Sequence, residues 1–179
     1  MSLLERLLMR YFLPDLYAKS VVEISPNLLC ILGIKTVLID LDNTLTPTGS
    51  WDIRDDVKMW LEQLKANGFN IYIVSNEVRS QRLTHIAEAL GVLYIAPAWK
   101  PRSSFVKRML EKHGIGIKQT VMIGDQLFTD IFMAKRIGMF TILVEPMTNL
   151  NFITTKVLRC FERPLIKWMH TKNILRRCA

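Results

Sequence analysis

Two aspartates stand two positions apart at the end of an apolar stretch of this 179-residue chain. The stretch KTVLIDLDNTLTP, residues 35–47, places Asp40 and Asp42 after a run of branched apolar residues. In a strand, side chains two positions apart point the same way, so both carboxylates can stand at the mouth of a sheet. A buried carboxylate is costly unless it is paired or holds a metal. The alternative is a capping aspartate next to a loop aspartate, which a D-x-D-x-T stretch alone does not exclude.

Polar residues also follow three later apolar stretches. Ser75 and Asn76 offer a hydroxyl and an amide to a phosphoryl oxygen, although such a pair is also an ordinary helix cap. Lys100 precedes a proline, which disfavours helix at that position, but an isolated lysine is most often a solvated charge. Asp125 and Asp130 follow a glycine that permits a tight turn. Each feature alone is weak evidence for a functional site. Their common placement after apolar stretches makes the evidence stronger.

The rest of the chain alternates short β-branched runs with longer helical patterns. Continuous apolar residues predict strands that are buried on both faces at 36–41, 70–75, 92–96, 120–124 and 140–145. Helical spacing that ends in a glycine predicts helices at 54–68, 79–91, 102–114 and 128–138. The alternation predicts an α/β fold, a three-layer doubly wound parallel sheet with helices on both faces. Such sheets bind ligands at the carboxyl ends of their strands, where the polar residues lie.

Taken together, the polar residues form four motifs in a fixed order. D-x-D-x-T, Ser, Lys-Pro and G-D-x-x-x-x-D follow successive predicted strands, and this order resembles the signature motifs of the haloacid dehalogenase (HAD) superfamily over residues 35–145. DLDNTL, GDQ and ILVEP further resemble the subfamily IIIA phosphatases of the YqeG type, which are similar to mitochondrial phosphatidylglycerophosphate phosphatases. The resemblance implies a HAD-like Rossmannoid core. The stretches 45–74 and 77–99 leave no room for a cap domain, so we expect an open site.

The resemblance also implies a role for each motif residue. Asp40 would attack phosphorus and form an aspartyl-phosphate, Asp42 would act as general acid and base, and Lys100 would offset the developing negative charge. An acid at position 42 favours a phosphatase over a dehalogenase, because only the phosphatase must protonate an alkoxide. The phosphoryl oxygens would be held by residues of three motifs, namely Thr44, Ser75, Asn76 and Lys100.

A divalent cation is the cofactor that the resemblance implies. Mg²⁺ would bind the side chains of Asp40 and Asp125 and the backbone carbonyl of Asp42, with waters and phosphate completing an octahedron. Asp130 would contact these ligands without binding the cation itself. The cation would relieve the repulsion between neighbouring carboxylates and an incoming phosphate. Complete motifs favour an enzyme, and the alternative is a binding protein that keeps the HAD frame without turnover.

The chain carries a net charge of +8, most of it near the C-terminal end, because residues 147–179 hold seven Lys and Arg residues against one acid. We expect an N-terminal amphipathic helix and lead-in at 1–34, a phosphatase core at 35–146 and a basic amphipathic tail at 147–179. Pro164 should break or kink the helix of the tail. The tail's composition favours contact with an anionic lipid surface, while nucleic acid or the protein's own core remain alternative partners.

No stretch reaches the length of a membrane-spanning helix, and the three cysteines match neither a disulfide framework nor a zinc site. We therefore expect a cytoplasmic protein in a reducing compartment, attached peripherally to the inner face of a membrane through its termini. The expected activity is Mg²⁺-dependent hydrolysis of a phosphomonoester, with phosphatidylglycerophosphate, an anionic phospholipid, as the substrate. A soluble sugar phosphate or a nucleic-acid end remain alternative substrates, and the oligomeric state stays open.

Overall fold

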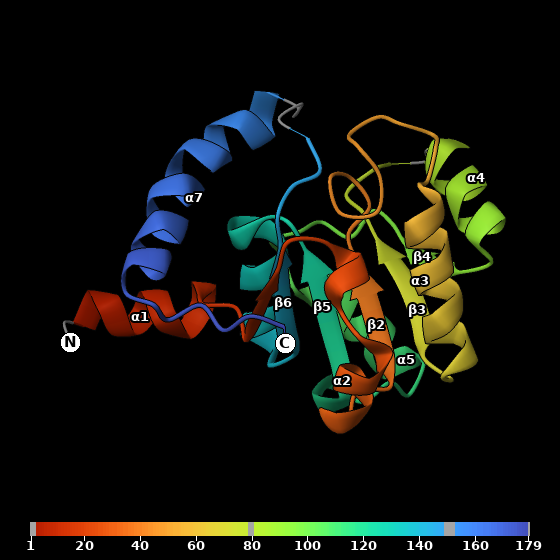
Figure 1. Ribbon diagram of the computed structural model, residues 1–179, viewed down its shortest axis with the longest axis horizontal. Coiled ribbons are helices and arrows are strands. Elements are labelled where there is room, and N and C mark those ends of the chain that lie inside the picture. The colour runs from red at the N-terminus through yellow and green to blue at the C-terminus, as the bar shows by residue number, and fades with distance from the viewer. Residues whose placement is uncertain (1–2, 79–80, 149–152, 179) are drawn as a thin grey trace.

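Six parallel strands form a single sheet in the computed structural model, which describes residues 3–78, 81–148 and 153–178 (Figure 1). The strands are β1 (Leu16–Ala18), β2 (Thr36–Ile39), β3 (Asn70–Val74), β4 (Leu93–Ile95), β5 (Thr120–Gly124) and β6 (Phe140–Val144). Their order across the sheet is β1-β6-β5-β2-β3-β4, and every pairing is parallel. The chain leaves β2 toward one edge and later returns on its other side. This reversal next to β2 is where doubly wound sheets bind ligands.

Helices cover both faces of the sheet, as the alternation predicts. They are α1 (Leu3–Phe12), α2 (Pro26–Ile31), α3 (Asp55–Ala66), α4 (Gln81–Leu90), α5 (Ser104–Lys112), α6 (Phe132–Ile137) and α7 (Ile153–Thr171). Two 3₁₀ turns, η1 (Val21–Glu23) and η2 (Ile117–Gln119), and a π-helical turn, η3 (Leu127–Ile131), complete the elements. Val37 and Ile39 of β2 belong to an apolar cluster with α3 and α4, whereas Leu38 belongs to a second cluster with α5 and α6. The fold is therefore a three-layer Rossmann-like α/β sheet.

The structure corrects three details of the expected elements. β1 is a sixth strand, paired with β6, which a run of three residues was too short to indicate. β4 lies at a free edge of the sheet, where Leu93 is 63% exposed and Tyr94 is 44% exposed, so this strand is not buried on both faces. α7 continues through Pro164 without a break, because buried residues on both sides of the proline, Glu162 and Met169, hold the helix against the core.

The expected helix at 128–138 begins as a π-helical turn. Within η3 the amide of Ile131 donates to the carbonyl of Gln126 at 3.2 Å, five residues back. This wide turn carries the fully buried Asp130 back against Gly124 at the end of β5. The regular helix α6 follows it. Single π turns of this kind occur frequently at functional sites.

The two terminal helices pack on the part of the core around η3 (Figure 1). The ring of Phe12 in α1 stacks on that of Phe132 in α6, with centroids 5.0 Å apart. The fully buried Met169 of α7 shares an apolar cluster with Tyr17 of β1 and Leu127 of η3. Among the described residues, no helix combines the length and the apolar character that a membrane span requires.

Candidate active site

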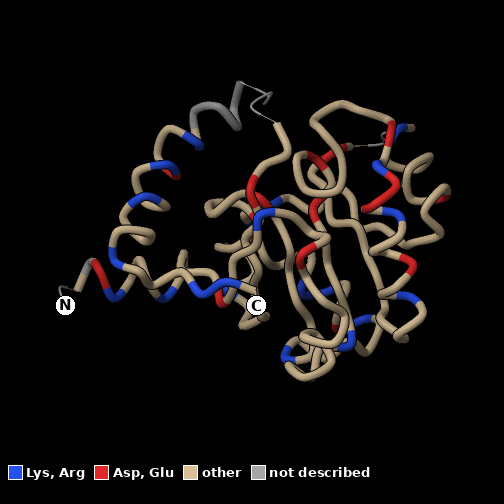
Figure 2. Tube along the Cα trace, viewed as in Figure 1, with Lys and Arg blue, Asp and Glu red and all other residues tan. Residues whose placement is uncertain are grey.

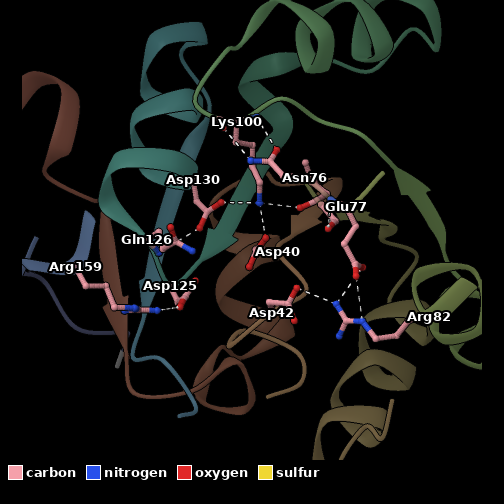
Figure 3. A network of polar contacts seen from close by, with 12 residues as sticks. Asp40, Asp42, Asn76, Glu77, Arg82, Lys100, Asp125, Gln126, Asp130 and Arg159 are labelled. Carbon is pink, nitrogen blue, oxygen red and sulfur yellow. Dashed lines mark hydrogen bonds and ion pairs between the residues drawn. The ribbon is translucent and has the colours of Figure 1, made fainter. Parts of the chain in front are cut away.

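Asp40 is the first residue after β2 and stands at the carboxyl end of the sheet (Figure 3). Its backbone amide donates to the carbonyl of Ile123 at 2.9 Å, which extends the pairing of β2 with β5 as far as this residue. The aspartate is 7% exposed, whereas the next residue, Leu41, is fully buried in the apolar cluster. The central strand thus delivers one nearly buried carboxylate to the mouth of the sheet.

A buried lysine, Lys100, reaches this carboxylate from the segment between β4 and α5. Lys100 Nζ donates to Asp40 Oδ1 and, at 2.8 Å, to Asp130 Oδ1. Its third hydrogen bond, at 2.9 Å, goes to the carbonyl of Val74, so all three donors of the ammonium are used. Burial by itself would lower the pKa of Lys100, but the charges of Asp130 and Asp40 raise it above its ordinary value. The ammonium is therefore a fixed positive charge beside Asp40.

Asn76 holds the main chain of Lys100 in place. Its side-chain nitrogen donates to the Lys100 carbonyl at 2.9 Å, and its oxygen accepts from the Lys100 amide at 2.7 Å. The hydroxyl of Ser75 accepts a bond from the Glu77 amide at 3.1 Å. The buried hydroxyl of Thr44 finds no hydrogen-bond partner among the residues that the structure describes, so a phosphoryl oxygen could satisfy it. Direct substrate contacts of these three residues stay a prediction.

Asp125 follows β5 directly and is buried at 1% exposure. Its Oδ2 accepts a hydrogen bond from Arg159 of α7. Its Oδ1 is also buried and has no hydrogen-bond partner within the described part of the chain. Burial raises the pKa of Asp125 well above its usual range, Asp40 and Asp130 add to this, and Arg159 opposes it. One oxygen of this carboxylate therefore lacks the partner that a buried charge requires.

Gly124 and Asp130 approach each other more closely than a side chain at position 124 would allow. A Cβ atom built on Gly124 would lie 2.5 Å from the carboxylate of Asp130, so only glycine fits here. The other oxygen of Asp130, Oδ2, accepts from the amide of Gln126 at 3.2 Å. Both oxygens of Asp130 are thus engaged, one by this amide and one by Lys100.

The carboxylates of Asp40, Asp125 and Asp130 each bring one oxygen within 4.8 Å of the others. Burial raises the pKa of Asp40 to about 7, repulsion from Asp130 and Asp42 adds to this, and Lys100 opposes it. A cation between Asp40 and the unpartnered Oδ1 of Asp125 would relieve the repulsion and satisfy that oxygen. The donors are all oxygens, which Mg²⁺ prefers. These residues therefore fit a divalent cation.

Asp42 stands at the more open side of the site, with its side chain 20% exposed. Arg82 of α4 donates to its Oδ2 at 2.9 Å, and the amide of Gly49 donates to its Oδ1 at 3.0 Å. Arg82 also pairs with Glu77 at 3.0 Å and donates to the carbonyl of Ser50 at 3.0 Å. Burial alone would lower the pKa of Arg82, but Glu77 and Asp42 raise it. A charged guanidinium thus ties Asp42 to the loop that follows it.

Sequence reasoning missed Arg82, Arg159 and Glu162. Arg82 and Asp42 are separated by 40 residues, and Arg159 and Asp125 by 34, so no local spacing links them. Glu162 accepts a bond from the amide of Phe128 at 2.8 Å and is fully buried. As the one acid among the seven basic residues of the tail, it was the available signal that this helix has a partner in the core.

Comparisons with known proteins show which family the chain belongs to. Residues 3–148 match the family model described as mitochondrial PGP phosphatase. The chain belongs to this family. It is 32% identical over 167 residues to the probable phosphatase YqeG of Bacillus subtilis, which covers 93% of this chain and 96% of that protein. The expected resemblance to YqeG-type phosphatases is confirmed, and the protein is a phosphatase with a HAD-like core.

A second similar protein is longer than this chain. The chain is 27% identical over 170 residues to phosphatidylglycerophosphate phosphatase 1, chloroplastic/mitochondrial, of Arabidopsis thaliana, covering 89% of this chain and 49% of that protein. It thus spans about half the length of the plant relative. A solved structure of an uncharacterized protein from Listeria monocytogenes serotype 4b superposes with a TM-score of 0.52 at 21% identity, covering 67% of this chain and 86% of that one. This similarity supports the fold alone.

Proposed function

We propose that this phosphatase cleaves a phosphomonoester through a phosphoryl group carried on Asp40. The observation that carries the proposal is a single nearly buried carboxylate placed between the ammonium of Lys100 and the carboxylate of Asp125. Attack of an Asp40 oxygen on phosphorus breaks the bond to the leaving alkoxide and leaves an aspartyl-phosphate, which water then hydrolyses. Two easier displacements replace one difficult step.

Asp42 supplies the proton transfers in this proposal. It would give a proton to the departing alkoxide and later take one from the attacking water, which contributes roughly 10²- to 10⁴-fold in rate. Its partly exposed side chain lies where both could reach it. Arg82 and the Gly49 amide each hold one of its oxygens and so fix its orientation.

Mg²⁺ would be held by the side chains of Asp40 and Asp125 and by the carbonyl of Asp42, where it would offset the negative charge of phosphate and carboxylates. Lys100 supplies a second positive charge next to the nucleophile. Hydroxyl groups of Thr44 and Ser75 would donate to phosphoryl oxygens. Asp130 stays out of the reaction and holds Lys100.

Replacement of Asp40 and of Asp42, one at a time, separates formation of the phosphoenzyme from proton transfer. Asp40→Asn should form no phosphoenzyme, whereas Asp42→Asn should still take up labelled phosphate from an aryl phosphate and turn over roughly 10²- to 10⁴-fold more slowly. The measurements are Mg²⁺-dependent phosphate release and acid-stable labelling of the protein. Equal residual rates and equal labelling of the two variants would contradict these roles.

The proposed substrate is phosphatidylglycerophosphate. An apolar groove of about 450 Å³ lies between α1, η3 and α7, and its lining includes Leu8, Phe128, Phe161, Leu165 and Trp168. Phe128 belongs to the same turn as Asp130, so an acyl chain in the groove would bring a lipid headgroup toward the carboxylates. Lys and Arg residues lie along both helices (Figure 2). The exposed ones include Arg6, Arg10, Arg163 and Lys167. Such cations favour an anionic lipid surface.

Surface substitutions test the lipid more sharply than deletion of the tail, because deletion would also remove the contact of Arg159 with Asp125. The double variant Arg163→Gln/Lys167→Gln should lower turnover of phosphatidylglycerophosphate in anionic vesicles about tenfold and leave turnover of a soluble aryl phosphate unchanged. Arg108→Gln/Lys112→Gln removes the same charge from exposed sites on α5 and is the matched control. If the native protein ignores the lipid but cleaves a sugar phosphate or a nucleic-acid end, the substrate assignment is wrong.

A further inference from the structure

Helix α7 turns two charged residues inward at its second and third turns. Arg159 is 8% exposed and Glu162 is fully buried, whereas Cys160, Phe161 and Arg163 around them are exposed. Residues three positions apart share one face of a helix, so this charged pair forms a single contact surface. A helix that merely covered apolar core would present apolar residues there.

The charged pair of α7 contacts the segment that carries Asp125. Arg159 Nη2 donates to Asp125 Oδ2, and Glu162 Oε1 accepts from the amide of Phe128 at 2.8 Å (Figure 3 shows the arginine). The two contacts lie three residues apart on α7 and three residues apart on the segment after β5. Helix α7 therefore holds that segment at its start and at its middle. Met169 and Leu127 belong to one apolar cluster, which continues the same interface.

The contact with Arg159 is confined to one oxygen of Asp125. Oδ2 is used by the guanidinium, while the buried Oδ1 has no partner among the described residues. A carboxylate held at one oxygen cannot rotate freely about its χ2 angle, so the other oxygen keeps a fixed direction. Carboxylates that bind metals are commonly held in this way by a neighbouring hydrogen-bond donor, and loss of the donor costs about 10- to 100-fold in metal affinity.

We propose that Arg159 is a positioning residue that presents Asp125 Oδ1 to the divalent cation, which makes α7 a part of the active site. The inference rests on the proposed function, since it assigns Asp125 to the metal. The opposite role is that the guanidinium occupies the place of the cation and competes with it. The two roles differ in sign, because loss of a positioning residue weakens Mg²⁺ binding, whereas loss of a competitor strengthens it.

The experiment is calorimetric titration of the full chain with MgCl₂. Arg159→Gln should bind Mg²⁺ about 10- to 100-fold more weakly than the native protein. Arg159→Lys keeps the charge but has a shorter reach and no planar fork, so its affinity should lie between the two. Lys172→Gln, which removes an exposed cation just after the same helix, should bind Mg²⁺ as the native protein does. An Arg159→Gln affinity equal to or tighter than the native value would overturn the proposal.

Kinetics supply a second readout that a merely structural role would not give. Arg159→Gln should raise the Mg²⁺ concentration needed for half-maximal phosphate release by the same factor, and its kcat should recover to within about threefold at saturating Mg²⁺. If Arg159→Gln does not fold, the titration of Arg159→Lys decides, and native or tighter affinity overturns the proposal. Either outcome leaves the phosphatase function itself to the separate test with Asp40→Asn.

Discussion

Lys100 and Asp130 form an ion pair with Nζ and Oδ1 2.8 Å apart and with side chains that are 4% and 0% exposed. The same ammonium donates to Asp40. Replacement of Lys100 by Met would leave two buried carboxylates without their shared cation, which is far more costly than loss of an exposed charge. We expect Lys100→Met to lower kcat by about two to three orders of magnitude. Phosphate release at saturating Mg²⁺ measures this, with the exposed Lys107→Met as control, and a less than tenfold loss would contradict the role of Lys100.

Arg82 links Asp42, the proposed general acid and base, to the loop that follows Asp42. Arg82→Gln removes the ion pair with Asp42 and the bond to the Ser50 carbonyl, so Asp42 loses its fixed orientation. We expect kcat to fall about 10- to 100-fold, a part of what proton transfer contributes, while Mg²⁺ affinity stays within about twofold, because Arg82 contacts none of the three clustered carboxylates. Steady-state kinetics and Mg²⁺ titration separate the two effects. An equal loss of kcat and of Mg²⁺ affinity would contradict this, because it would show that Arg82 supports the whole site.

The sequence predicted what local patterns encode. Continuous apolar runs located five of the six strands, and the D-x-D-x-T and G-D-x-x-x-x-D spacings located Asp40, Asp42, Asp125 and Asp130 at the mouth of the sheet. Their catalytic roles remain predictions. Patterns could not reveal partners such as Arg82 and Arg159, because those contacts exist only once distant helices pack on the sheet. The π-helical turn was hidden for the same reason, since its wide geometry fits Asp130 against Gly124 and leaves no periodic signature.

Mg²⁺ binding should depend on pH near neutrality. In the metal-free site burial raises the pKa of Asp40 to about 7, with Asp130 adding and Lys100 opposing. Below pH 7 a proton therefore occupies a group that the cation needs in its ionised form, so affinity falls as pH falls, by about tenfold per pH unit for each proton displaced. Calorimetry in two buffers of different ionisation enthalpy should reveal proton release at pH 6 and less release at pH 8. Affinity that does not change between pH 6 and 8 would contradict this.

Gly124→Ala should disturb the site without changing any charged residue. The new methyl group would lie 2.5 Å from the Asp130 carboxylate, which is anchored by Lys100 and the Gln126 amide and cannot move aside without breaking those bonds. Overpacking of this kind costs roughly 1–3 kcal/mol in free energy of unfolding, and displacement of Asp130 should also lower kcat because Lys100 shifts with it. Denaturant unfolding and phosphate release are the measurements.

Gly116→Ala is the matched control for this substitution. A Cβ atom at Gly116 would meet the side-chain oxygen of Gln119 at 3.3 Å, and this flexible side chain can move away. We expect its free energy of unfolding to stay within about 1 kcal/mol of the native value, because the reduced freedom of the unfolded chain offsets any small strain. If the two alanine variants proved equally stable and equally active, the close approach of Asp130 to β5 could not be what holds Lys100 in place.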